Sequence, residues 1–164
     1  MKTINKTDKT DPVVKELVDL LSKGNAHASL EDALKNLPFA LLGEKPGMLP
    51  YSIWQLAEHI RIAQWDILEF SSNPKHVSPK WPDGYWPTAA APKSKAAWVK
   101  CITQIVKDRN AFIDLIKKTG SNIDKPFKHG DGQSLLKEAL VLADHNSYHT
   151  AEIIVIRRLL NAWK

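Results

Sequence analysis

Residues 134–163 carry apolar side chains at the three- and four-residue spacing of a helix, and two histidines lie on the same stripe. At about 100° per residue, His145 and His149 fall on one side of this predicted helix. The apolar residues on that side are Leu135, Leu142, Ile153, Ile156 and Leu160. The two histidines are therefore predicted to point into the core of a helical protein.

Two imidazoles one helical turn apart can bind a single metal ion. A third ligand must come from elsewhere in the chain, and the candidate is His59, on a stripe with Leu56 and Ala63. Core histidines held by buried hydrogen bonds are the alternative. Three inward imidazoles carry three acceptors that all need partners, and a shared metal satisfies them together. The sequence predicts a metal site, and imidazole ligands suit zinc, nickel, iron and copper alike.

Signals for helix starts and stops divide the rest of the chain. Asp11 and Pro12 open a first helix that ends before Gly24, and Pro38 stops a short second one. Residues 1–10 are expected to be a mobile arm preceding one domain, residues 11–164. Further starts are marked by the capping boxes at residues 29–32 and 52–55 and by Ser94, whose helix is expected to reach Lys118.

Composition narrows the class of protein. The single cysteine, Cys101, excludes a disulfide framework and fits a reducing compartment. Residues 1–11 are polar, and no run of 18 apolar residues occurs. The net charge of +5 is spread along the chain, which favours a solvated surface over a nucleic-acid or membrane interface. We expect a cytoplasmic protein with a small-molecule partner, and a homodimer is left open.

Two segments resemble a known family. Residues 54–59 (Trp-Gln-Leu-Ala-Glu-His) and 144–149 (Asp-His-Asn-Ser-Tyr-His) are similar to motifs of the DinB/YfiT-like family, and the likeness covers residues 11–163. The resemblance implies an all-α four-helix bundle with a three-histidine divalent metal site, matched here by His59, His145 and His149. Characterised members include transferases and isomerases that use low-molecular-weight thiols such as bacillithiol. The expected cofactors are therefore a zinc, nickel or iron ion and a thiol cosubstrate.

Residues 71–93 hold five prolines and three aromatic residues, and a loop of this length in a compact domain usually has a function. Residues 85–87 (Tyr-Trp-Pro) are similar to a loop in one branch of the family. Trp81, Tyr85 and Trp86 are predicted to line a substrate pocket over the metal, or else only to anchor the loop. Arg109 and His27 are further candidates for binding substrate.

Several charged residues lie near the predicted site. Arg109 needs an acid partner such as Asp66 or Asp108, an anionic ligand, or a path to the surface. Asp66 is expected to pair with a buried cation or to face a polar pocket.

Glu152 and Asp144 are the candidate catalytic residues, because either could orient an imidazole or accept a proton. Tyr148 is expected to pack beside the site, and Cys101 to be an inert core thiol. The chain is thus predicted to be a metal-dependent enzyme of thiol-transfer or hydrolytic type. The alternative is a non-catalytic metal- or ligand-binding protein of the stress response.

Overall fold

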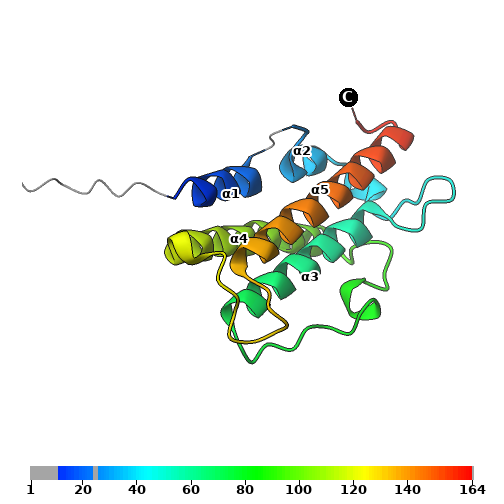
Figure 1. Ribbon diagram of the computed structural model, residues 1–164. Helices are drawn as coiled ribbons and strands as arrows, with labels where there is room; N and C mark the ends of the chain where they lie inside the picture. The colour runs from blue at the N-terminus through cyan, green and yellow to red at the C-terminus, as the bar shows by residue number, and fades with distance from the viewer. Residues whose placement is uncertain (1–10, 24–25, 164) are drawn as a thin grey trace, which may run out of the picture.

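The computed structural model describes residues 11–23 and 26–163, and within these ranges the chain forms helices and no strand. Four helices make the bundle predicted from sequence, and one short helix is added to it (Figure 1). No helix in the described ranges has the length and apolar content needed to cross a membrane. The predicted arm, residues 1–10, lies outside the described residues. The helices are α1 (Pro12–Ser22), α2 (Leu30–Leu34), α3 (Ile53–Ser72), α4 (Lys95–Thr119) and α5 (Leu135–Leu159).

The helices begin where the sequence predicts. Asp11 accepts two backbone N–H bonds at the start of α1. Capping boxes open α2 and α3, with Ser29 paired to Asp32 and Ser52 paired to Gln55. Each cap satisfies N–H groups that lack a partner within the helix. At the starts of α4 and α5, the hydroxyl groups of Ser94 and Ser134 each accept one backbone N–H bond.

Two apolar clusters fill the bundle. One includes Leu56, Ile60 and Ile153 and lies toward the start of α3 and the end of α5. The other includes Phe112 and Leu142 and lies where α1 packs on α4 and α5. Figure 1 shows α3 and α5 running side by side, with α1 and α2 in succession along one side of the bundle. The polar part of the interior lies between the two clusters along α3 and α5.

The end of α5 is tied to α2 by the buried side chain of Arg157. Its guanidinium donates to the backbone carbonyls of Ala33 at 2.6 Å and Lys35 at 3.1 Å in the α2 region. It also donates to the carbonyl of Ala162 at 2.7 and 2.9 Å, and it lies 4.9 Å from the centre of the Trp163 ring. A five-residue helix is unstable by itself. Arg157 therefore holds α2 and the last residues of the chain on α5.

Candidate metal centre

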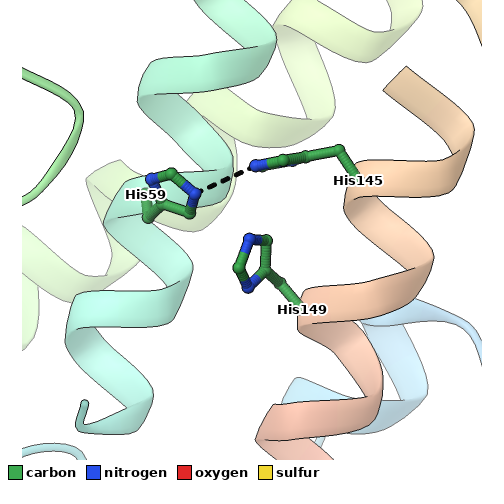
Figure 2. A group of neighbouring side chains, drawn as sticks. All are labelled: His59, His145 and His149. Atoms are coloured by element: carbon green, nitrogen blue, oxygen red, sulfur yellow. Dashed lines mark hydrogen bonds between the residues drawn. The ribbon is translucent and has the colours of Figure 1, made fainter. Parts of the chain in front are cut away.

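The three predicted histidines come together between α3 and α5. His59 projects from α3 toward His145 and His149, which lie one turn apart on α5 (Figure 2). Their ligand atoms lie within 4.8 Å of one another, and the Nε2 atoms of His59 and His145 are 3.0 Å apart. His59 and His149 are 2% and 7% exposed. The helical periodicity thus predicted the direction of each side chain correctly.

Each imidazole has an oxygen atom beside its Nδ1. The Nδ1 of His59 donates to the backbone carbonyl of Tyr85 at 3.0 Å, and that of His149 to the carboxylate of Glu152 at 2.7 Å. His145 places Nδ1 3.4 Å from the side-chain oxygen of Asn146. The Tyr85 carbonyl and the Glu152 carboxylate keep the proton of His59 and of His149 on Nδ1. The Nε2 atoms of His59 and His149 are therefore unprotonated, and His145 can donate its Nε2–H to His59 at 3.0 Å.

Burial keeps these rings neutral. Burial, helped by the nearby His149, lowers the pKa of His145 to about 4. Burial and the neighbouring His59 lower the pKa of His149 as well. Burial also lowers the pKa of His59. Neutral imidazole is the form that binds metal, so the site is prepared for a cation at neutral pH.

The donor set fits a divalent ion. The Nε2 atoms of His59 and His145 share a hydrogen bond at 3.0 Å, and a cation bound by both rings would take the place of its proton. Nitrogen bonds of roughly 2.1 Å at angles near 90–110° place ligand atoms about 3.0–3.4 Å apart. The His59–His145 pair already has this spacing. A metal-binding histidine also usually donates its other N–H to an oxygen acceptor, as His59 and His149 do.

The segment between α3 and α4, residues 73–94, is called the crossover segment below. It lies against His59, as the sequence predicted for this loop. The Trp86 ring stacks on the His59 ring, with 3.9 Å between the ring centres. The Tyr51 ring stacks on Trp86, with 4.0 Å between the centres. Trp81 is 69% exposed and contacts Tyr85. Tyr85 and Trp86 thus contact the site directly, and a substrate role for any of the three aromatics stays a prediction.

Asp66 faces a polar group rather than a buried cation from another helix. Its carboxylate accepts a hydrogen bond from the Tyr85 hydroxyl at 2.6 Å and one from His76 Nε2 at 2.7 Å. Both partners belong to the crossover segment. Asp66 therefore holds this segment on α3.

Arg109 and His27 lie away from the three histidines. Arg109 pairs with Glu31, and not with Asp66 or Asp108, the two acids named as possible partners from the sequence. The reason is that α2 places an acid over this part of α4, which periodicity within one helix cannot show. His27 contacts the Ser147 hydroxyl at 2.9 Å. Arg109 and His27 both line a cavity of about 370 Å³ among α1, α4 and α5, to which the three histidines do not contribute.

The two candidate catalytic acids differ. Glu152 contacts His149, and burial raises the pKa of its carboxyl group. Asp144 is exposed, and within the described part of the chain no hydrogen bond joins it to an imidazole.

Tyr148 packs edge-on against His149, as expected, with 63% of the residue exposed. Cys101 lies in the core, as expected, and burial raises the pKa of its thiol; its inertness stays a prediction.

Sequence reasoning missed two groups that orient the imidazoles. The Tyr85 carbonyl is a backbone atom, so no residue type marks it in the sequence. Asn146 directly follows His145, and its other side-chain atom donates to Gln64 at 3.2 Å. In the sequence, the only sign of this role is that the amide side chain of Asn146 directly follows the predicted ligand His145. Its role depends on Gln64 lying across the interface, on α3.

Comparison with known proteins supports the same assignment. The model of the DinB superfamily matches residues 25–153, which is more than half of the chain. Searches of curated proteins and of solved structures gave no significant match. The match covers all three histidines, the whole of α3 and α5 as far as Ile153. The chain belongs to the DinB superfamily.

Proposed function

We propose that this protein binds one divalent metal ion through His59, His145 and His149 and uses it in a reaction on a small molecule. The reaction would be a thiol-dependent transfer or isomerisation, or a hydrolysis. One observation carries the proposal: three imidazoles from two helices turn their Nε2 atoms toward one another, while each Nδ1 has an oxygen atom beside it (Figure 2). Three protein ligands are typical of catalytic rather than structural metal sites.

When bound, such an ion acts as a Lewis acid toward a water, a thiol or a carbonyl group. The surrounding residues supply the other requirements. Glu152 holds the tautomer of His149, and its side chain is 34% exposed, so it can also take up a proton from a substrate. The rings of Trp86 and Tyr148 border the histidines and offer an apolar surface to a ligand. A small molecule is the partner that this arrangement fits, rather than nucleic acid or a membrane.

The first test is elemental analysis of the purified protein. We expect about one divalent ion per chain in the wild type and none in the His145→Ala/His149→Ala double variant, because two lost ligands cannot be replaced by water without a large loss of affinity. His129→Ala is the matched control, because this histidine lies outside the site and donates to the carbonyl of Phe70. Stoichiometric metal in the double variant would place the site elsewhere.

The second test separates the single contribution of His59. If His59 binds the ion, His59→Ala reduces the rise in melting midpoint that added metal produces in the wild type. A purely structural His59 would lower the midpoint of the metal-free protein and leave the metal-dependent rise unchanged.

A third test distinguishes an enzyme from a binding protein. The competing function is a non-catalytic metal- or ligand-binding protein, which the covering of His59 by Trp86 and Tyr85 favours. The metal-loaded and metal-free proteins are compared in transfer of low-molecular-weight thiols to a fluorogenic electrophile and in ester hydrolysis. Metal-dependent turnover that His149→Ala abolishes supports the enzyme. Stoichiometric metal without turnover in either assay supports the binding protein.

A further inference from the structure

The crossover segment is attached to α3 on both sides of His59. Before His59, Ser52 donates to the carbonyl of Ala90, and Gln55 donates to that of Pro87 at 3.3 Å. After His59, the attachment is the contact of Asp66 with Tyr85. Between the two attachments, the segment presents the Tyr85 carbonyl to His59. Helix α3 therefore carries the candidate ligand His59. It also carries side chains that hold the Tyr85 carbonyl, the acceptor of the His59 hydrogen bond, in place.

Within the described part of the chain, the side chain of Asp66 makes its hydrogen bonds to the crossover segment. The residue is 8% exposed, and a buried carboxylate is costly unless hydrogen bonds satisfy it. Both of its oxygens are occupied by donors of the crossover segment, Tyr85 and His76. Burial and Asp66 together raise the pKa of the Tyr85 hydroxyl to about 12, so this group stays a proton donor at neutral pH.

We propose that Asp66 and Tyr85 are positioning residues of the metal centre: Asp66 fixes the Tyr85 side chain, and the Tyr85 carbonyl then fixes the ring and the tautomer of His59. This inference rests on the proposed metal-binding function. Groups that orient a metal-binding histidine typically contribute 10–100-fold to metal affinity. The attachments through Ser52 and Gln55 remain when the Tyr85 hydroxyl is removed, so an effect of about tenfold is expected.

The decisive variants are Tyr85→Phe and Asp66→Asn. Tyr51→Phe is the matched control, because it removes the same hydroxyl group from a ring that stacks on Trp86 without contacting Asp66. Zn²⁺ affinity is measured on the full-length, metal-free proteins by competition with a chelating dye. Tyr85→Phe and Asp66→Asn should each bind Zn²⁺ about tenfold more weakly than the wild type, and Tyr51→Phe within about twofold. The double variant should be no weaker than the weaker single variant, because both changes break one pathway.

A second measurement tests the positioning without metal. Nitrogen-15 NMR of the imidazoles in the metal-free proteins reports which nitrogen of His59 carries the proton. We expect the Nδ1–H form in the wild type and Tyr51→Phe, and a mixture of tautomers in Tyr85→Phe. If the wild type binds no metal, the proposed function fails, and this measurement still tests the positioning. An unchanged tautomer together with unchanged Zn²⁺ affinity in Tyr85→Phe overturns the inference, even if that variant is less stable.

Discussion

Replacement of Arg157 by methionine should destabilise the protein through lost contacts with backbone carbonyls. Arg157 is 6% exposed as a residue, and its guanidinium donates to carbonyls in the α2 region and to that of Ala162. A hydrogen bond from a charged donor contributes roughly 1.5–3 kcal/mol net. Methionine keeps the packing of the aliphatic part of the side chain. It also removes the cost of burying a charge, a cost that lowers the pKa of Arg157. The carbonyl of Ala33, a fully buried residue, cannot turn to water.

The balance of these effects predicts a loss of about 2–4 kcal/mol in the free energy of unfolding for Arg157→Met. Equilibrium unfolding in urea, followed by circular dichroism, measures it. Arg158→Met is the control, because Arg158 is the exposed neighbour and such surface changes stay within about 0.5 kcal/mol. Hydrogen exchange should also show faster exchange in α2 of Arg157→Met. Equal unfolding midpoints for the two variants would refute the reasoning.

Three further predictions concern the site and its surroundings. The pKa of His145 is about 4 in the folded protein and about 6.5 in the unfolded chain. Between these values the unfolded chain binds more protons, so the metal-free protein should lose stability as pH falls from 6.5 to 4. Urea unfolding at pH 7.5 and 5 should show a smaller loss for His145→Ala than for the wild type, and equal losses would contradict it. In the dye assay, Glu152→Gln should bind Zn²⁺ about tenfold more weakly than the wild type, because Glu152 contacts the imidazole of His149. Asp144→Asn should stay within about twofold of the wild type. The reverse order would exclude the orienting role of Glu152. Cys101 should react with a thiol reagent at pH 8 only after unfolding in urea, because it is buried with a raised pKa; rapid reaction of the folded protein would count against this.

Local signals and helical periodicity predicted much of this structure. The pairs Ser29–Asp32 and Ser52–Gln55 act within three residues, so their capping role can be read from the sequence alone. The inward direction of His59 follows from its neighbours on one helix. The partner of Arg109 could not be predicted, because it lies 78 residues earlier in the chain and depends on how α2 packs. The same holds for the Tyr85 carbonyl, since side-chain patterns do not encode the placement of a backbone atom.

The placement of His59 beneath the crossover segment has a consequence for the order of folding. The contact of His59 with Tyr85 closes 26 residues of chain, whereas its contact with His145 closes 86. Closing the longer loop costs about 1 kcal/mol more in chain entropy. We therefore expect the α3 half of the site to form before α5 docks on it. The complete set of ligands then exists only in the native bundle, so metal binding would report tertiary assembly rather than helix formation.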